Sequence, residues 1–432
     1  MYCLLDANNF YVSAERIFRP ALEGVPVIVL SNNDGCAISR SEEAKALGVT
    51  MGMPYFQIRQ QLPGASIVAL SANYGLYGAI STRLMSLAAG LGPSQEIYSI
   101  DETFIGLQGL RGCLATRARA VRERILQWVG LPCGVGIGPT KTLAKLANYV
   151  AKAAERKPGS YPKEFAQVFH LGALPASDLD AVLQATPATE VWGIGRRIGA
   201  QLDSVGIRTA LDVAWMDPAA ARRRWGVVFE RTVRELQGLP CLELEDAPPP
   251  KQEIASTRSF GRVVTQLPDL VEAVSEFASR AAEKLRREES LAGQVLVFVH
   301  TSPFRRDDRQ YSRAARIPLR RPTADTGEIV TAAVAGLERI YRPNYNFVKA
   351  GVHLLDLQSQ GIEQGELGLD EDSPARARLM AAMDRINQRY GRGTLQIASA
   401  GLGRDQREWT MRQELRTPCY MTRWDEVPVA RA

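Results

Sequence analysis

The sequence predicts a multidomain protein of the α+β class. Its 432 residues exceed what one hydrophobic core usually organises. Strand-like and helix-like segments alternate through the first 154 residues, in an order that suits a sheet with helices on one side. After a proline-rich break, a β-α-β-β-α-β order over residues 253–355 predicts a second, smaller sheet domain.

The N-terminal segment is expected to begin with a strand, Tyr2–Leu5, that leads directly into Asp6. A helix opens at the polar and aromatic residues 8–11 and ends near Pro20. Pro26–Leu30 is an apolar run that predicts another buried strand. Because an acid at the end of a strand faces whatever binds there, Asp6 is a candidate functional residue.

An acidic pair lies in the next part of the chain. Residues 31–35 form a turn-rich loop, and a helix with Glu42 and Lys45 follows. β-branched and aromatic residues then flank Asp101 and Glu102, which predicts two strands that meet at a tight turn. The pair therefore stands at the tip of a predicted hairpin.

Three further elements complete the first alternation: a helix over 114–129, a strand at Cys133–Ile137 and a Lys-rich helix. Lys141, Lys145 and Lys152 fall on one face of that last helix, near the acidic pair. A solvated basic face is the plain interpretation, which we favour for Lys141 and consider for Lys145.

Residues 168–236 are expected to form mostly short helices. Within them, Gly193 and Gly195 occupy a tight turn before an amphipathic helix, an arrangement that resembles a helix-hairpin-helix element. Backbone N–H groups at such a turn hold a phosphate without reading bases. The acidic and then triple-proline segment Glu243–Pro250 breaks regular structure and predicts a linker.

Most of the excess positive charge lies beyond that linker. The net charge is +6 and the pI about 9.0, and residues 251–352 contain 17 Lys and Arg against 12 Asp and Glu. A charge run is usually a solvated surface, but this positive bias favours an anionic partner, and contacts of basic groups with phosphates are independent of sequence and weaken in salt. The arginines on and around one strand-like segment are Arg305, Arg306, Arg309, Arg313, Arg316, Arg320 and Arg321.

Cysteine and histidine content argues against a zinc cluster. Six cysteines are scattered without a CxxC pair, and only His170, His300 and His353 could join them. This pattern suits a reduced, cytoplasmic protein. Asp6 interrupts the apolar run that a signal peptide would need, and later apolar runs are too short to cross a bilayer. We expect neither export nor membrane insertion.

Asp6, Asp101 and Glu102 suit one particular chemistry. Nucleotidyl transfer needs carboxylates on adjacent strands, because divalent cations a few ångströms apart must activate a hydroxyl and neutralise a triphosphate. Such hard oxygen ligands favour magnesium. Alone, an Asp-Glu pair at a turn is more typical of a solvated turn, so the assignment depends on the other motifs.

Several further motifs accompany these acids in a fixed order. They are Asp6-Ala-Asn-Asn-Phe10-Tyr11, Ser31-Asn-Asn-Asp-Gly-Cys36, Tyr98-Ser-Ile-Asp101-Glu102, Gly134-Val-Gly-Ile-Gly138 with Lys141-Thr-Leu-Ala-Lys-Leu-Ala-Asn148, Val191-Trp-Gly-Ile-Gly195, Lys251-Gln-Glu-Ile254, Arg258-Ser-Phe-Gly261 and Thr301-Ser-Pro-Phe304. Together they resemble the Y-family (lesion-bypass) DNA polymerases, and within that family the UmuC-like branch, which provides the catalytic subunit of bacterial DNA polymerase V, rather than the DinB branch. The resemblance covers about residues 1–360.

The resemblance implies a right-hand polymerase fold with a ferredoxin-like palm, small fingers, a helical thumb with the helix-hairpin-helix and a little-finger domain. The implied ranges are 1–10 and 77–167 for the palm, 11–76 for the fingers, 168–240 for the thumb, 241–250 for the linker, 251–355 for the little finger and 356–432 for a C-terminal tail in partner or clamp interaction.

The resemblance also implies roles for the residues of the active site. Asp6, Asp101 and Glu102 would be the catalytic acids and, with the main-chain carbonyl of Ala7, the ligands of two Mg²⁺ ions. Tyr11, which follows Phe10 at the substrate, would be the steric gate whose ring excludes a 2′-hydroxyl. From composition alone, Tyr11 is equally typical of an ordinary aromatic residue at the start of a helix.

Phosphate contacts are implied as well. Lys152 would reach the incoming triphosphate. Many family members use a Tyr-x-x-Arg pair in the fingers where this chain has Glu42 and Lys45, so Lys45 would act as a point charge and Glu42 would make no contact. The DNA-binding residues would be Gly193, Gly195, Arg258, Arg305, Arg306 and Arg313.

The implied activity is template-directed, error-prone translesion synthesis from dNTPs on primer-template DNA, in the SOS response to DNA damage. The implied protein partners are a UmuD′-like dimer and a RecA filament. Gln364–Leu369 faintly resembles the peptide that docks on a sliding clamp, although Asp370 stands where an aromatic residue is typical. The polar last 75 or so residues are expected to be only partly ordered.

Three other functions compete with this interpretation. A P-loop nucleotidase would need a glycine directly before Lys141, and none is present. A non-catalytic DNA-binding accessory protein of the same fold would be favoured by an incomplete acidic triad. A helix-hairpin-helix nuclease or glycosylase would need a base-flipping pocket. Primer extension with magnesium separates all three from a polymerase.

Overall fold

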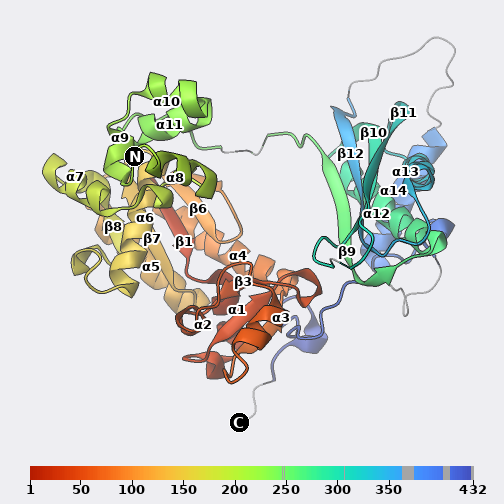
Figure 1. The fold of residues 1–432 in the computed structure, drawn as a ribbon, viewed down its shortest axis with the longest axis horizontal. Helices are drawn as coiled ribbons and strands as arrows, with labels where there is room; N and C mark the ends of the chain where they lie inside the picture. The colour runs from red at the N-terminus through yellow and green to blue at the C-terminus, as the bar shows by residue number, and fades with distance from the viewer. Residues whose placement is uncertain (246, 248, 306, 362–373, 402–408, 430–432) are drawn as a thin grey trace. The chain divides into compact units, whose positions relative to one another are not determined.

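The computed structural model describes residues 1–245, 247, 249–305, 307–361, 374–401 and 409–429. The chain divides into two compact units. Residues 1–31, 35–248 and 415–432 form the first unit, and residues 32–34 and 249–414 form the second. Each unit combines helices with β-sheet (Figure 1), which confirms the predicted α+β multidomain class.

The first unit is built on a five-stranded sheet whose central strand comes from the N-terminus. This strand, β1, is antiparallel to β6 on one side and to β7 on the other, and β8 joins β7 in parallel. The order is β5-β6-β1-β7-β8, with bounds Ser94–Ile97 (β5), Glu102–Gly106 (β6), Tyr2–Ala7 (β1), Cys133–Gly138 (β7) and Val168–His170 (β8).

Two sequence predictions for this sheet are wrong. β1 extends through Ala7, so Asp6 lies inside the strand and not beyond its end. Residues 168–170 form the strand β8, where the sequence predicts short helices. Three residues are too few to show a strand period, and β8 exists because its backbone pairs with that of β7.

Helices cover both faces of this sheet, not one. Leu5, Ile105 and Val135 share a core with α4 (Tyr74–Ala88) and α5 (Leu114–Val129). Alternate residues point to the other face, where Leu4 and Phe104 pack with Ala144 of α6 (Lys141–Arg156). The helix α1 (Phe10–Phe18) joins the first of these cores.

Glycines explain how closely α6 lies on the sheet. A Cβ at Gly136 of β7 would lie 2.1 Å from the backbone nitrogen of Asn148 and 2.2 Å from the carbonyl oxygen of Ala144. At Gly134, a Cβ would lie 3.0 Å from Cε of Lys152. The alternating glycines of this motif therefore bring α6, and with it Lys152, against the sheet face that carries Asp6.

A small three-stranded sheet completes the N-terminal part of the first unit, and it contains the predicted strand at residues 26–30. The order is β3-β2-β4, with β2 and β4 parallel. The bounds are Val27–Leu30 (β2), Ala37–Arg40 (β3) and Val68–Ser71 (β4), with the helices Glu42–Ala46 (α2) and Tyr55–Gln61 (α3).

Beyond β8 the first unit is helical, as predicted. Leu183, Leu202, Phe229 and Val233 are among the apolar residues that form its core with part of α6. The helices are Ala176–Ala185 (α7), Arg196–Asp203 (α8), Ala210–Ala214 (α9), Pro218–Trp225 (α10) and Val227–Leu236 (α11).

Short 3-10 helices of three residues each occur in both units. They lie at Pro20–Leu22, Asn32–Asp34, Ala89–Leu91, Lys163–Phe165, Leu171–Ala173, Ala188–Glu190, Ala398–Ala400 and Trp424–Glu426.

The second unit has the predicted β-α-β-β-α-β order, in an antiparallel sheet β11-β10-β12-β9. Its two main helices pack on one face of that sheet (Figure 1), around a core with Phe277, Phe347 and Trp409. The elements are Ile254–Val264 (β9), Leu267–Arg287 (α12), Ser290–Thr301 (β10), Ser312–Thr323 (β11), Thr326–Ile340 (α13) and Phe347–Ser359 (β12).

A further helix, α14 (Pro374–Tyr390), belongs to the second unit and was not predicted from the sequence. The guanidinium of Arg286 on α12 holds it through two hydrogen bonds of 2.7 Å to the carboxylate of Asp384. Residues 374–390 are therefore more regular than their polar composition indicates. The segment Gln364–Leu369, with its resemblance to a clamp-binding peptide, lies outside the described residues.

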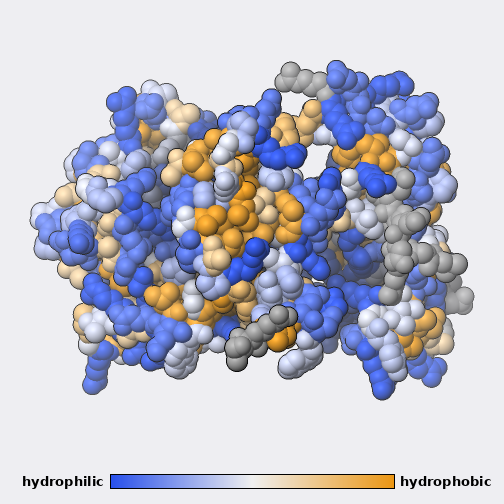
Figure 2. Space-filling view, turned by 90° about the horizontal axis from the view of Figure 1, so that it is seen from below, coloured by the Kyte–Doolittle hydropathy of each residue, from blue (hydrophilic) through white to orange (hydrophobic). Residues whose placement is uncertain are grey.

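The face of the molecule drawn in Figure 2 is mostly hydrophilic, with hydrophobic residues gathered in places. Among the helices that the structure describes, none combines the length and the apolar character that crossing a membrane requires.

Glu15 is a buried carboxyl group in the first unit. It has no solvent exposure, and its Oε1 accepts hydrogen bonds from the hydroxyls of Tyr77 at 2.7 Å and Thr417 at 3.1 Å. Burial raises the pKa of Glu15, although these two hydrogen bonds and Arg19 lower it in part. The folded state therefore disfavours the ionised form.

Replacing Glu15 with Gln is expected to stabilise the protein at high pH. The unfolded chain ionises this group near pH 4.5, while the folded chain ionises it at a higher pH. The free energy of unfolding of the wild type therefore falls as pH rises through the folded-state pKa of Glu15. The Gln variant does not ionise at this position, so its free energy of unfolding does not fall for this reason. We expect a Tm higher by about 2–4 °C at pH 8 and no gain near pH 5, measured by thermal unfolding. Glu123→Gln on the exposed face of α5 is the control, and an equal gain for both variants would contradict the burial argument.

Candidate functional site

Three acids meet where β1 and β6 run side by side. Asp6 lies directly opposite Glu102 in the register of the two strands. The N–H of Ala7 donates to the carbonyl of Asp101 at 2.9 Å, which fixes the start of β6 to the end of β1. The structure thus brings together the acids that the sequence analysis expects to converge.

Ser99 organises the turn that carries two of these acids. Its hydroxyl donates to the carboxylate of Asp101 at 2.6 Å and accepts from the N–H of Glu102 at 3.0 Å. Ser99 was not predicted as a site residue. A hydroxyl two residues before an acid in a turn is a recognisable signal for this hydrogen bond.

Lysines of α6 face the acids. Lys152 pairs with Asp6 at 2.6 Å and Lys145 with Glu102 at 2.7 Å. Lys141 pairs with Glu96 and is only 4% exposed. A solvated basic face is therefore wrong for Lys141 and Lys145, since both ammonium groups also lie over aromatic rings, Lys141 over Phe104 and Lys145 over Tyr98 and Trp192.

The pKa of Asp6 reflects its burial and its charged neighbours. Burial raises the pKa of Asp6 above its ordinary value, the ammonium of Lys152 opposes that shift, and the charges of Glu102 and Asp101 add to it. Desolvation and like charge therefore both act against ionised Asp6. This cluster needs positive charge beside it, and Lys152 supplies part of that charge.

The donor set suits a hard divalent cation. Three carboxylates and the main-chain carbonyl of Ala7 offer only oxygen ligands, which Mg²⁺ and similar ions prefer. Among the described residues, no three His, Cys, Asp or Glu side chains are arranged as metal ligands as they stand. Asp6 and Glu102 instead engage Lys152 and Lys145, and a cation would take over the neutralising role of these lysines.

Aromatic rings hold Tyr11 near the acids. Its ring stacks on that of Tyr77, with centroids 4.5 Å apart, and meets Tyr74 edge-on at 6.1 Å. Burial raises the pKa of the half-buried Tyr11 hydroxyl, with smaller contributions from Tyr74 and Asp101. Phe10, predicted at the substrate, is only 3% exposed, which leaves it a packing partner of Tyr11 and Tyr77.

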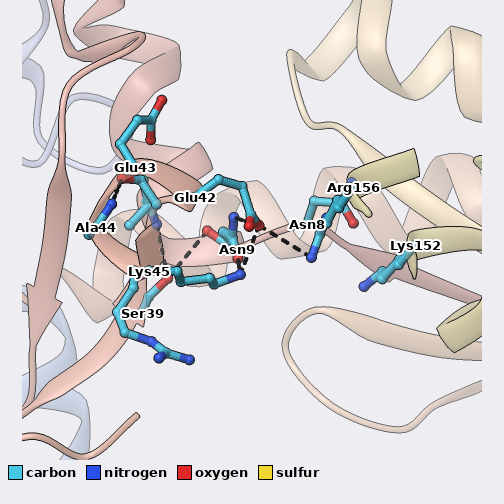
Figure 3. A network of polar contacts seen from close by, with 12 residues as sticks. Asn8, Asn9, Ser39, Glu42, Glu43, Ala44, Lys45, Lys152 and Arg156 are labelled. Atoms are coloured by element: carbon cyan, nitrogen blue, oxygen red, sulfur yellow. Dashed lines mark hydrogen bonds and ion pairs between the residues drawn. The ribbon is translucent and has the colours of Figure 1, made fainter. Parts of the chain in front are cut away.

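A second charged network lies between α2 and α6 (Figure 3). The ammonium of Lys45 donates to Asn9 at 2.7 Å and to Glu42 at 2.8 Å. Arg156, one turn after Lys152 on α6, pairs with the same Glu42 oxygen at 3.3 Å. Glu42 thus holds two cations, one of them on the helix that also carries Lys152.

The pKa values in this network follow its contacts. Burial tends to raise the pKa of Glu42, but hydrogen bonds from Lys45 and Asn9 and the charge of Arg156 bring it below the ordinary value. The pKa of Lys45 is lowered, chiefly by burial. Arg156 was not predicted as a site residue, although its position four residues after Lys152 places it on the same side of α6.

The glycine turn in the helical part lies directly before α8. Gly193 has a φ of +91°, a conformation that glycine adopts most readily, and Gly195 is the N-cap residue of α8. Trp192, beside them, packs on Phe104 and Tyr98. DNA binding by this turn stays a prediction.

The predicted DNA-binding arginines of the second unit separate into two groups. Arg258 lies over the rings of Phe277 and Trp409, on the side of the sheet that the helices cover. Arg305 lies before β11 and Arg313 at its start, and both are exposed. Arg306 lies outside the described residues.

The sheet face without helices carries further basic groups. Inward-facing Ala315, Ile317 and Leu319 of β11 pack on the core, so exposed Arg316 points the other way. Lys349 of β12 lies over Phe298, on that same face. Arg316 belongs to the basic stretch predicted from the sequence, whereas Lys349 was not singled out there.

Models of two related families match most of the chain. The impB/mucB/samB family matches residues 5–149, and its C-terminal domain matches residues 251–367. A domain of unknown function, DUF4113, matches residues 377–430.

Curated relatives match the chain from end to end. Protein ImpB of Salmonella typhimurium is 44% identical over all of both chains, and protein UmuC of Salmonella typhimurium strain LT2 is 43% identical over 99% of each. DNA polymerase IV of Moorella thermoacetica is 30% identical over 90% of this chain and 93% of its own.

Solved structures share the fold. The Y-family DNA polymerase chimera Dbh-Dpo4(243-245)-Dbh has a TM-score of 0.63 at 18% identity, over 83% of this chain and 99% of that chain. An insertion ternary complex of Dbh DNA polymerase has a TM-score of 0.52. The fold, relatives and acid-bearing sheet define a DNA-directed DNA polymerase of the Y family. Within that class, this chain belongs to the impB/mucB/samB family, and the predicted resemblance is confirmed.

Proposed function

We propose that this polymerase performs error-prone translesion synthesis by two-metal-ion nucleotidyl transfer, adding dNTPs to a primer 3′-hydroxyl as part of the SOS response. The observation that supports this most directly is the register of β1 and β6, which sets Asp6 opposite Glu102 and ties Ala7 to Asp101. Carboxylates on adjacent strands are what this reaction requires. The complete triad argues against a non-catalytic accessory protein.

The acids have the role of holding two Mg²⁺ ions. Asp6, Asp101, Glu102 and the carbonyl of Ala7 would hold the ions, which would supply a lower pKa for the attacking hydroxyl and positive charge beside the triphosphate. Lys152 shields Asp6 in the structure at hand and pairs with phosphate oxygen when a nucleotide enters. The carboxylates do not themselves attack phosphorus.

The charged network around Glu42 contributes to triphosphate binding. Lys45 and Arg156 share the carboxylate of Glu42, which keeps both cations oriented. Lys45 is a compact point charge and Arg156 a planar donor, so the two make different phosphate contacts. Glu42 itself repels phosphate and acts only through these cations.

Tyr11 selects the sugar. Its ring is fixed by stacking on Tyr77, and a rigid ring under C2′ excludes a ribose hydroxyl by steric clash. The small residue Gly35, in the loop between β2 and β3, would cover the templating base loosely, which would admit damaged bases and lower fidelity.

The ranges of the right-hand architecture belong to this proposal. The palm is 1–10 and 77–167, the fingers 11–76, the thumb 168–240 and the little finger 251–355, with a linker at 241–250 and a tail at 356–432. β8 at residues 168–170 completes the palm sheet, so the palm would end slightly later.

The proposed setting is the bacterial cytoplasm after DNA damage, with a UmuD′-like dimer and a RecA filament as partners and a sliding clamp as a third. The test is extension across an abasic site in Mg²⁺ with and without these proteins. Insertion opposite the abasic site, stimulated by the dimer and the filament, is expected. Termination one nucleotide before the site under every condition would contradict translesion function.

Removing basic groups from the helix-free sheet face is expected to weaken DNA binding and its salt dependence. Each lost phosphate contact lowers the slope of log affinity against log salt by about 1, so the double variant Arg316→Gln/Lys349→Gln loses about 2. Fluorescence anisotropy at several salt concentrations measures the slope. Arg339→Gln, at an exposed position of α13 on the helix-covered side, is the control and should keep the wild-type slope. Equal slopes for the double variant and wild type would place the DNA elsewhere.

A further inference from the structure

The chain after residue 414 returns to the first unit and pairs with the end of β4. The N–H of Ser71 donates to the carbonyl of Leu415 at 3.0 Å, and the N–H of Leu415 donates to the hydroxyl of Ser71 at 2.9 Å. Tyr420 stacks on Phe18 of α1, with ring centroids 4.8 Å apart. We call residues Leu415–Glu426 the C-terminal strap.

Buried hydrogen bonds anchor the strap at the start of α4. Asn73, the N-cap residue of that helix, is 2% exposed. Its amide donates to the carbonyls of Thr417 at 3.0 Å and Pro418 at 3.1 Å. Buried hydrogen bonds of this kind fix the position of the strap on α4, because an amide or carbonyl group that is buried without a hydrogen-bond partner destabilises the fold.

The strap, α1 and α4 meet at one carboxylate oxygen. Oε1 of Glu15 accepts from both Thr417 and Tyr77, at 3.1 and 2.7 Å. Among the described residues, Oε2 of Glu15 has no hydrogen-bond partner. A carboxyl group that is fully buried needs hydrogen-bond donors, and for Glu15 these two hydroxyls are the donors.

The same contacts continue to Tyr11. Tyr77 stacks on Tyr11 with an interplanar angle of 20°, and Glu15 follows Tyr11 by four residues on α1, one turn of the helix. The hydroxyl of Tyr77 is thus fixed by Glu15, and its ring supports the ring of Tyr11. Thr417 helps to fix Glu15 from the other side.

We propose that Thr417 of the C-terminal strap is a positioning residue for Tyr11 and thereby sets discrimination between deoxyribonucleotides and ribonucleotides. The proposal rests on the sugar-selecting role proposed for Tyr11. Steric exclusion works only while the ring cannot retreat, and displacements near 1 Å in an active site change rates markedly. Thr417 acts through Glu15 and Tyr77, and not through direct contact with the nucleotide or with Asp6, Asp101 and Glu102.

Single-nucleotide insertion of a dNTP and of the matching rNTP by the full chain tests this. Thr417→Val keeps the side-chain shape and removes the hydroxyl. The ratio of kcat/KM for rNTP over dNTP is expected to rise about fivefold, because the net free energy of the lost hydrogen bond to Glu15 corresponds to a factor of that size. The same hydroxyl also accepts from the Asn73 amide at 3.2 Å, which affects the strap and not Glu15. Thr422→Val, at an exposed threonine of the same strap, is expected to leave the ratio unchanged.

Tyr77→Phe provides a second variant, which removes the other hydroxyl bound to Glu15 and is expected to raise the ratio similarly. Since both hydroxyls act through one oxygen, the double variant should show less than the product of the two effects. If Thr417→Val lowered the Tm but left the ratio of rNTP to dNTP insertion unchanged, the strap would contribute only to stability. That result would overturn the proposal.

Tyr11→Ala separates this proposal from the one on which it rests. A raised ratio for Tyr11→Ala with an unchanged ratio for Thr417→Val overturns the positioning role alone. An unchanged ratio for Tyr11→Ala overturns the sugar-selecting role of Tyr11, and the positioning role with it.

Discussion

Replacing Asp101 with Asn is expected to reduce primer extension by about 10³-fold or more, while affinity for primer-template DNA stays within about twofold. The carboxylate accepts a 2.6 Å hydrogen bond from Ser99 and lies beside Asp6 and Glu102. The amide keeps the shape and the hydrogen bond but removes one negative charge from the proposed cation site. Steady-state and single-turnover insertion measure the loss.

The matched control is Asp180→Asn, which makes the same change at an exposed position of α7. It should leave extension and DNA binding as in wild type. If Asp101→Asn lost DNA binding in parallel with extension, Asp101 would have a structural role, and the catalytic assignment would be wrong.

Tyr11→Ala is expected to raise ribonucleotide insertion relative to deoxyribonucleotide insertion on the order of 10²-fold. Removing the ring opens the space that a 2′-hydroxyl would occupy, whereas dNTP binding loses only van der Waals contact. Competition between the matched dNTP and rNTP in one reaction measures the ratio directly. Tyr11→Phe keeps the stacked ring and should keep wild-type selection, so relaxed selection in Tyr11→Phe would assign the discrimination to the hydroxyl and not to the ring.

The parts of the fold that follow local patterns were predictable. The hairpin at Asp101 and Glu102 has turn residues between β-branched strands, and the second unit alternates strand and helix with clear lengths. The position of Asp6 close to that hairpin could be predicted only in part. The strand ends and the order of the motifs indicate that Asp6 and the hairpin share one edge of a sheet.

Contacts between distant segments were not predictable. β8 is defined by pairing with β7, and the close packing of α6 on one sheet face depends on which residues of β7 are glycine. The buried pairing of Lys141 with Glu96 also escapes the sequence, since the period of a helix shows which residues share a face but not what that face meets. The same holds for Thr417 and Glu15, which are 402 residues apart.

The most direct test of the central claim is the binding of Mn²⁺, as a spectroscopic substitute for Mg²⁺, to a complex of the polymerase with a chain-terminated primer-template and dNTP. Wild type should bind two ions per complex in electron paramagnetic resonance titrations, and Asp6→Asn should bind fewer at the same free Mn²⁺ concentration. Equal ion binding by wild type and Asp6→Asn, with DNA and dNTP bound in both, would show that the carboxylate opposite Glu102 holds no cation.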